Sequence, residues 1–301
     1  MEEIFERVRK LKAEKDAVIL AHYYVDGDVQ KVADYIGDSY YLSKVATTLS
    51  EKVIIFAGVN FMADSAKVLN PDKKVILPDI TADCPMAHMV TPAQIRKARE
   101  LYEDLAVVCY INSTLDIKAE SDVCVTSANA IKVVKALPNK NIFFIPDKNL
   151  AHYVAEHIPD KHFIYNEGFC PIHNYMAVKY LEDIKAKYPD IKVLAHPECP
   201  RLVLAQADYI GSTSGIIDYA TKSKDNKFLV LTENGVSHKL KADNPDKMFI
   251  FNDLSICPDM KKITLESIVK SLESLEPEVF VEEELRLKAL KPLEKMLELA
   301  K

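Results

Sequence analysis

The sequence predicts an α/β protein made of three homologous three-layer α/β/α domains, with their parallel sheets arranged around a pseudo-threefold axis. Two observations lead to this prediction. Three segments, each running from the end of an apolar run into the next helix, can be superimposed without gaps, and later apolar runs recur at the same period. Within each copy, patterns typical of strands alternate with patterns typical of helices, which favours parallel strands covered by helices on both faces.

The composition is that of a globular protein that dissolves in water. The chain has 301 residues, of which 49% are hydrophobic and 28% are charged. Its apolar runs are far shorter than a membrane-spanning helix, so we expect no contact with a membrane. The amino-terminal stretch MEEIFERVRKLKAEK has the pattern of an amphipathic helix instead of a signal peptide, which predicts a cytoplasmic protein. The formal net charge of -6 argues against a nucleic-acid partner.

Each copy opens with a strand end that is followed by polar residues at fixed intervals. The three segments are ILAHYYVDGDVQKVADYIGDS, VVCYINSTLDIKAESDVCVTS and VLAHPECPRLVLAQADYIGST, which start 88 and then 86 residues apart. In each, the strand ends at a histidine or tyrosine, and an aspartate and then a hydroxyl residue follow. These residues are His22, Tyr110 and His196; Asp34, Asp122 and Asp208; and Ser39, Ser127 and Thr213. Because ligands bind beyond the carboxyl ends of parallel strands, we expect the three copies to meet at one centre.

Later apolar runs keep the same register. They start at Val53, Ile142 and Phe228, and again at Val75, His162 and Met248. Together with the opening strand they predict a βαβαβαβ unit in every copy. The connecting segments have helical patterns, for example Val29, Val32, Ala33 and Ile36 at i, i+3, i+4 and i+7. Helices are also expected after Ser39, Ser127 and Thr213, with each hydroxyl residue at the N-cap.

The period of the repeat sets the predicted domain boundaries. We expect a first α/β repeat over residues 1–88, a second over 89–174 and a third over 175–261, followed by a helical tail over 262–301. The tail should begin a helix near Thr264. It should end in a helix that carries Leu290, Leu293 and Leu297 on one face, and we expect it to pack on the first repeat.

Three of the six cysteines follow the repeat. Cys84, Cys170 and Cys257 each precede a proline, at spacings of 86 and 87 residues. A core cysteine has no reason to recur in a loop at that period, so these three are expected to be metal ligands. Cys109 and Cys124 lie inside strand patterns and are expected to be core residues. Cys199 fits either role.

Three thiolates from three loops fit either zinc or an iron-sulfur cluster. No C-x-x-C pair is present, which argues against a zinc ribbon or finger. A 4Fe-4S cluster held by three cysteines leaves one iron free to act as a Lewis acid in dehydration or condensation. Two alternatives stay open: a three-cysteine iron-sulfur hydro-lyase acting on a hydroxy dicarboxylate, and a non-catalytic scaffold stabilised by zinc.

The strand ends carry residues suited to proton transfer. His22 and Tyr24, Tyr110 and Asn112, and His196 and Glu198 form pairs in which both side chains share one face of an extended strand end. Ser39, Ser127 and Thr213, which we call the hydroxyl ring, either cap three helices or bind an anion together with the helix N-termini. A substrate with carboxylates or a phosphate would suit such a site. His173, three residues after Cys170, is a further candidate.

Many stretches of the chain resemble quinolinate synthase, the A protein of bacterial and archaeal NAD biosynthesis. They are ILAHYY, ADYIGDS, FAGVNFMADSAKVLNPDKKV, CPMA, YINST, VTSANA, PDKNLAHYVA, HPECP, ADYIGSTSG and MKKITLESI. The resemblance implies that iminoaspartate and dihydroxyacetone phosphate condense to quinolinate, phosphate and water. It also implies three α/β/α domains and a 4Fe-4S cluster on Cys84, Cys170 and Cys257. An aspartate oxidase or dehydrogenase would supply the iminoaspartate and is the expected metabolic partner.

The resemblance also implies a set of substrate-binding residues. They are His22, Ser39, Tyr110, Ile111, Asn112, Ser127, His196, Pro197, Glu198 and Thr213, to which the spacing from Cys170 adds His173. Proton transfers are expected from Tyr24, Tyr110, His22, His196 and Glu198. Within this group we expect Glu198 to be the base and Tyr110 the acid.

Four positions depart from the usual pattern of the family. Tyr23 and His88 stand where asparagine is common, Asp83 stands where a small neutral residue is usual, and Asp259 stands where asparagine is common. Asp83 and Asp259 add negative charge beside an anionic cluster, which bears on its potential and its sensitivity to oxygen. None of the four removes an expected ligand or a repeated site residue.

Overall fold

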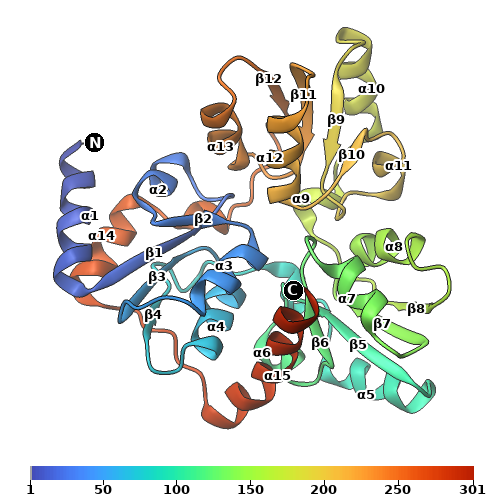
Figure 1. Cartoon of the computed structure of the whole chain (residues 1–301), viewed down its shortest axis with the longest axis horizontal. Coiled ribbons are helices and arrows are strands. Elements are labelled where there is room, and N and C mark those ends of the chain that lie inside the picture. The colour runs from blue at the N-terminus through green and yellow to red at the C-terminus, as the bar shows by residue number, and fades with distance from the viewer. Residues whose placement is uncertain (1) are drawn as a thin grey trace.

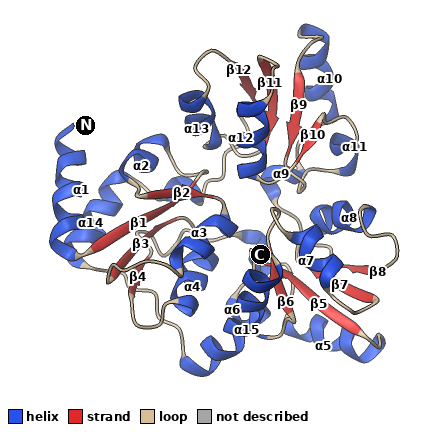
Figure 2. Ribbon diagram, in the orientation of Figure 1, coloured by secondary structure: helices blue, strands red, loops and turns tan. Residues whose placement is uncertain are grey.

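The structure is a computed structural model that describes residues 2–301 and contains three parallel sheets of four strands each (Figures 1 and 2). Each sheet belongs to one repeat, and the three repeats lie around a common centre (Figure 1). The predicted α/β fold class is therefore confirmed. Met1, at the start of the predicted amino-terminal helix, lies outside the described residues.

The first repeat has the strand order β2-β1-β3-β4. Its strands are β1 (Ala17–His22), β2 (Tyr35–Gly37), β3 (Val53–Ala57) and β4 (Lys74–Ile76). Its helices are α1 (Glu2–Lys15), α2 (Gly27–Val32), α3 (Ser39–Ala46) and α4 (Asn60–Leu69), followed by the 3-10 turn η1 (Pro85–His88). Every residue of β1 and β3 is buried, because helices cover both faces of the sheet.

The second and third repeats have the same strand order, with β6-β5-β7-β8 and β10-β9-β11-β12. The second contains α5 (Pro92–Leu101), β5 (Leu105–Tyr110), α6 (Leu115–Ala119), β6 (Val123–Val125), α7 (Ala130–Ala136), β7 (Asn141–Ile145), α8 (Lys148–Glu156), β8 (His162–Tyr165) and α9 (Pro171–Asn174). The third contains α10 (Val178–Lys187), β9 (Lys192–Ala195), α11 (Arg201–Leu204), β10 (Tyr209–Ile210), α12 (Thr213–Lys222), β11 (Lys227–Leu231), α13 (Val236–Asp243), β12 (Met248–Phe251) and η2 (Met260–Lys262). The predicted βαβαβαβ unit is present in every copy.

The strand order explains where a site can form. In each repeat the chain moves from the first strand to an edge and then returns to the other side of that first strand. The first and third strands therefore carry helices on opposite faces, and a crevice opens beyond their carboxyl ends. The three repeats place these strand ends around the common centre of the molecule (Figure 1).

The repeated aspartates fasten the second strand of each sheet to the first. Each carboxylate accepts a backbone N–H from the first strand, and each aspartate N–H donates to the carbonyl of the same strand residue. The carboxylate bonds are Asp34 to Ile19 at 2.8 Å, Asp122 to Val107 at 2.7 Å and Asp208 to Val193 at 2.8 Å. These bonds account for the recurrence of aspartate at this position, because the segment before a short strand needs a fixed register.

Two predictions about helices are wrong. Ile36 lies in β2, paired with Ala21, because the chain becomes extended at Ala33 and enters the sheet after α2 ends. The hydroxyl ring does not cap its helices either. The N-caps are Asp38, Asn129 and Ser212. The carboxylate of Asp38 accepts the Tyr41 N–H, and Ser212 Oγ accepts the Gly215 N–H, so Ser39 and Thr213 occupy the first helical position instead.

The tail joins two repeats. Helix α14 (Leu265–Ser274), capped by Thr264, packs against α1 and β3 of the first repeat. Helix α15 (Glu283–Leu299) lies along α6 and β6 of the second repeat and also reaches α4, so the tail does not cover the first repeat alone (Figure 1). Within residues 2–301, no helix combines the length and the apolar character needed to cross a bilayer.

Buried or partly buried hydrogen bonds also connect the repeats in pairs. They run from Lys118 Nζ to Phe61 O at 3.1 Å, from Asn149 Nδ2 to Glu198 O at 2.9 Å and from Gln30 Nε2 to Gly235 O at 3.1 Å. Lys118 is fully buried and also donates to Ser65 Oγ at 2.8 Å. Such contacts fix how the three crevices face one another.

Removing a repeated aspartate should destabilise the fold. Asp122 accepts the buried Val107 N–H and pairs with Arg99 at 3.1 Å. Alanine at this position leaves that N–H without an acceptor, so Asp122→Ala should lower the free energy of unfolding in urea by about 1–3 kcal/mol. The exposed Asp116 lies in the same repeat, and Asp116→Ala should change it by less than about 0.5 kcal/mol. Equal stability of the two variants would show that this fastening contributes nothing.

Candidate active site

A single cavity occupies the centre where the three crevices meet. Its volume is about 70 Å³. The predicted residues that line it come from all three repeats and are His22, Tyr24, Ser39, Cys84, Tyr110, Asn112, Ser127, Cys170, His173, His196, Glu198, Thr213 and Cys257. Ile111 and Pro197 are buried beside it but are not among the residues that line it. The strand ends of the three repeats thus bring together residues that are far apart in the sequence.

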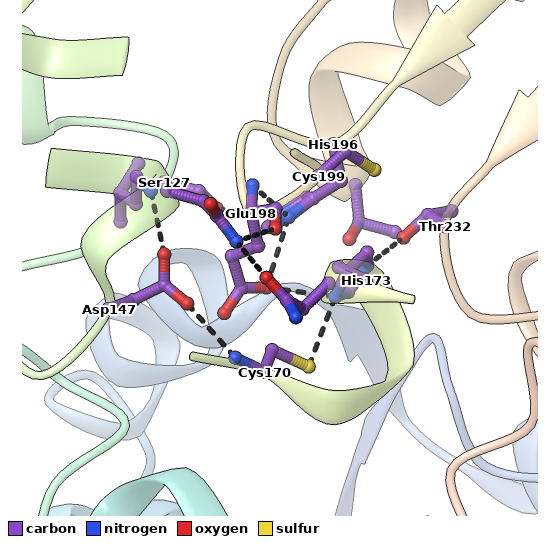
Figure 3. Close-up of polar contacts among 12 residues, drawn as sticks. Ser127, Asp147, Cys170, His173, His196, Glu198, Cys199 and Thr232 are labelled. Carbon is purple, nitrogen blue, oxygen red and sulfur yellow. Dashed lines mark hydrogen bonds and ion pairs between the residues drawn. The ribbon is translucent and has the colours of Figure 1, made fainter. Parts of the chain in front are cut away.

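Seven side chains form one continuous chain of polar contacts through all three repeats. It runs through Ser127, His196, Glu198, His173, Thr232, Tyr24 and Thr213. Its central member is Glu198, whose Oε2 lies 3.0 Å from His196 Nδ1 and 3.2 Å from His173 Nδ1 (Figure 3). Ser127 and Tyr24 are partly buried and the other five are buried, which strengthens their electrostatic interactions.

On one side of Glu198 the contacts continue to the second repeat. His196 Nε2 lies 3.1 Å from Ser127 Oγ. Because His196 Nδ1 faces a carboxylate, its proton is placed on Nδ1, and Nε2 is then free to accept the Ser127 hydroxyl. Ser127, His196 and Glu198 therefore form a hydroxyl–imidazole–carboxylate relay.

On the other side the contacts lead to the first repeat. His173 Nε2 lies 2.9 Å from Thr232 Oγ1, which in turn lies 2.7 Å from Tyr24 OH. Tyr24 OH also lies 2.8 Å from Thr213 Oγ1. Burial raises the pKa of Tyr24 well above its ordinary value, despite its two hydroxyl neighbours. Tyr24 therefore keeps its proton at neutral pH, with its hydroxyl group between Thr232 and Thr213.

Burial determines the charge of the central groups. It would by itself raise the pKa of Glu198, but His173 and His196 outweigh it and hold that pKa well below its usual range. Burial lowers the pKa of His196, and it lowers the pKa of His22 to about 4 even though Asp38 opposes the shift. The pKa of Tyr110 is raised well above its ordinary value, mainly by burial and further by the charge of Glu198. At neutral pH the Glu198 carboxyl group is thus ionised and the imidazoles of His22 and His196 are neutral. The phenols of Tyr24 and Tyr110 are protonated.

Three oxygen atoms at the centre are left for a ligand. Among the described residues, Glu198 Oε1, Asn112 Oδ1 and Asp38 Oδ2 are buried and have no hydrogen-bond partner within the protein. All three residues line the cavity. A buried oxygen without a donor is costly, so these atoms indicate where a bound molecule supplies N–H or O–H groups.

The three cysteines at the repeat period line the same cavity. Cys84, Cys170 and Cys257 are partly buried and form no disulfide bonds within the described chain. Burial raises the pKa of all three thiols, that of Cys257 to about 11, and the Cys257 thiol raises the pKa of Cys84 further. Thiols of this kind become thiolates when a metal replaces their protons. Cys109 and Cys124 lie in the core as predicted, and the structure places Cys199 there too.

One compact set of donor atoms lies beside the cysteines. Within the described part of the chain, Cys170, His173 and Glu198 form the group whose donor atoms all lie within 4.8 Å of one another. Cys170 Sγ lies 3.2 Å from His173 Nδ1 (Figure 3). The set could hold a metal ion, and it lies in the same cavity as the candidate acid–base residues.

Sequence reasoning missed some residues of the site. Thr232 joins His173 to Tyr24, but the equivalent positions in the other repeats are Gly58 and Pro146, so the repeat gave no signal. Asp38 lines the cavity and caps α3, and the polar residue before each member of the hydroxyl ring could have revealed it. Asp83 also lines the cavity and pairs with His88, so two departures from the family pattern are in contact.

The fold and the site together define a three-repeat α/β protein whose central cavity carries side chains suited to acid–base chemistry and a group that could hold a metal. Residues 6–298 match the family described as Quinolinate synthetase A protein. The chain therefore belongs to the quinolinate synthase family.

Named relatives agree with this assignment along almost the whole chain. A quinolinate synthase of Fusobacterium nucleatum subsp. nucleatum is 54% identical, with 98% of this chain and 99% of that protein covered. A quinolinate synthase of Clostridioides difficile is 48% identical, with 98% and 97% covered. Quinolinate synthase 2 of Methanosarcina acetivorans is 46% identical, with 98% and 95% covered.

Burial of a neutral His22 should make stability depend on pH. Between about pH 6.5 and pH 4 the unfolded chain takes up a proton at this residue that the folded protein does not. The free energy of unfolding should therefore fall as pH decreases through this window, by about 2 kcal/mol between pH 7.5 and pH 5. Urea unfolding at these two pH values should show that His22→Gln removes this part of the loss.

The matched control is His157→Gln, because the His157 side chain is exposed and outside the cavity lining. This variant should keep the full decrease. If His22→Gln loses as much stability as the wild-type protein between the two pH values, the neutral state assigned to His22 is wrong.

Proposed function

We propose that this protein condenses iminoaspartate with dihydroxyacetone phosphate to form quinolinate, phosphate and water, as a step of NAD biosynthesis. The observation that carries the proposal is the convergence of three repeat-related cysteines and the strand-end acid–base residues on one buried cavity. Membership in the quinolinate synthase family supports the same reaction. We further propose that the reaction takes place in the cytoplasm and that an aspartate oxidase or dehydrogenase supplies the iminoaspartate.

The cysteine spacing favours a cluster over a single zinc ion. A tetrahedral zinc ion with Zn–S bonds of about 2.3 Å brings its sulfur ligands to about 3.8 Å from one another. Cys84, Cys170 and Cys257 do not form a group of donors within 4.8 Å in the described chain. A 4Fe-4S cluster binds each thiolate to a different iron and so suits the wider spacing. When bound, it would offer one iron without a protein thiolate as a Lewis acid.

The hydroxyl ring is proposed to bind the anionic groups of the substrates. Ser39 and Thr213 stand at the first positions of α3 and α12, next to backbone N–H groups that have no partner within their helix. The positive ends of these helix dipoles favour carboxylate or phosphate oxygens. Asp38 and Ser212 cap α3 and α12, so Ser39 and Thr213 need not do so. Thr213 and Ser127 already contact Tyr24 and His196, and a hydroxyl group can make a further hydrogen bond to a ligand.

Glu198 is proposed as the base of the reaction. His173 and His196 hold Oε2, whereas Oε1 has no protein partner among the described residues. The two imidazoles keep the carboxylate ionised and fix its orientation. His196 in turn is oriented by Ser127, so a proton taken by Glu198 enters a chain of groups that can carry it.

Tyr110 is proposed as the acid, because its raised pKa keeps it protonated at the end of β5. Tyr24 and His22, in edge-to-face contact at 4.4 Å between ring centroids, would take part in further proton transfers.

Asn112 would donate and accept hydrogen bonds with the substrate. Ile111 and Pro197, buried between the members of two strand-end pairs, would hold their spacing.

Protein prepared without oxygen should be brown and should form quinolinate from the two substrates. Cys170→Ser should lose both the iron and the product, because serine does not replace a thiolate ligand of the cluster. Iron and sulfide analysis and product chromatography measure the two effects. Cys124→Ala is the control, because Cys124 is a buried core residue on β6, and it should keep its iron.

Full iron content in Cys170→Ser would contradict the ligand assignment. A colourless wild-type protein that contains zinc would support the zinc-stabilised scaffold, and a brown protein that forms no quinolinate would contradict the proposed reaction.

A further inference from the structure

Each cysteine of the proposed cluster site is held by a carboxyl group through its backbone. Cys84 N–H donates to Asp83 Oδ1 at 2.7 Å, Cys170 N–H donates to Asp147 Oδ2 at 3.0 Å, and Cys257 N–H donates to Glu233 Oε1 at 3.1 Å. The three bonds are made by three different repeats. The same interaction therefore recurs at all three ligands.

The second oxygen of each carboxyl group is also bonded. Asp147 Oδ1 accepts the Leu150 N–H at 2.6 Å, at the start of α8. Glu233 Oε2 accepts the Gly235 N–H at 2.6 Å, just before α13. Asp83 Oδ2 lies 2.7 Å from His88 Nε2, at the end of the η1 turn. Each carboxyl group thus links the backbone of one cysteine to a second, ordered segment.

Two of these carboxyl groups have equivalent places in the repeat. Asp147 and Glu233 are each the second residue after the third strand of their sheet. Val59 has this place in the first repeat and cannot accept a hydrogen bond through its side chain. There Asp83, from the cysteine loop itself, supplies the missing acceptor. The third interaction is therefore made in a different way from the other two.

We propose that Asp83, Asp147 and Glu233 are positioning residues that hold the three cysteines in the geometry the cluster needs. The inference rests on the cluster of the proposed function. A carboxylate can accept a hydrogen bond at both oxygens, whereas an amide accepts at one oxygen only. A carboxylate can therefore accept hydrogen bonds from the cysteine N–H and from the second segment at the same time, one at each oxygen. Groups of this kind orient metal ligands and tune the metal.

This role also gives a reason for two departures from the family pattern. Asp83 and His88 contact each other, and together they bracket the Cys84 turn. His88 is outside the cavity lining, and its side chain is 57% exposed. It contacts the Asp83 carboxylate there. Asp83 is thereby held in place although its side chain is 40% exposed.

The test compares Asp83→Asn and Asp147→Asn with Asp122→Asn. In the second repeat, the Asp122 carboxylate also accepts a backbone N–H, but from Val107 and not from a cysteine. The first readout is the rate at which protein loaded with its cluster loses iron to a chelator. We expect a rate about 10–100 times that of the wild-type protein for Asp83→Asn and Asp147→Asn, and an unchanged rate for Asp122→Asn.

A second readout needs no cluster. Hydrogen exchange of the cysteine N–H groups in cluster-free protein should be at least about tenfold faster at Cys84 in Asp83→Asn than in the wild-type protein, because the acceptor is weakened. Asp83 is half-exposed, so this variant is expected to fold even if Asp147→Asn does not. Circular dichroism verifies the fold of each variant.

The possible outcomes separate the two proposals. Wild-type iron loss and wild-type exchange in a folded Asp83→Asn would overturn the positioning role. Equal acceleration of iron loss in Asp122→Asn would also overturn it, because the effect would then be one of general stability. A wild-type protein that binds no cluster contradicts the proposed function, and faster exchange at Cys84 in Asp83→Asn would still support the positioning role.

Discussion

The carboxyl ends of parallel strands must lie at one edge of their sheet, and the rest of this structure depends on that constraint. Every repeat has the same strand order, so each presents one crevice beyond its first and third strands. Three crevices around one centre produce a cavity that no single repeat could enclose (Figure 1). This geometry brings the catalytic candidates and the three cysteines together, because each of them follows a strand end or lies in a loop at that edge.

The chemistry of the centre follows from how its buried charges are satisfied. A carboxylate in a cavity of low polarity is costly unless donors surround it. Glu198 has two imidazoles, and Asp147 and Glu233 have two backbone N–H groups each. The continuous contacts from Ser127 to Thr213 keep the polar groups paired. The oxygens of Glu198, Asn112 and Asp38 that have no partner among the described residues are then the ones open to a ligand.

The sequence was sufficient for much of this account, because a gapless repeat marks positions that a single copy would not. The strands, the strand-end residues and the three cysteines were predicted in this way. The core role of Cys109 and Cys124 was predicted from the strand patterns around them. The N-caps were not, because capping depends on which of two adjacent polar residues faces the helix, as with Asp38 and Ser39. Thr232 and the packing of α15 were missed because both arise from contacts between repeats, which no periodicity within one repeat encodes.

The central claim is that equivalent loops of three repeats hold one cluster with one iron open to the reaction. Quinolinate carries a ring nitrogen beside a carboxylate, an arrangement that chelates a metal in a five-membered ring. Mössbauer spectra of anaerobic protein enriched in iron-57, recorded with and without quinolinate, test the claim most directly. The account predicts that one of the cluster's four irons shifts when quinolinate binds. Four unchanged irons at saturating quinolinate would contradict it and would assign the cluster a structural role.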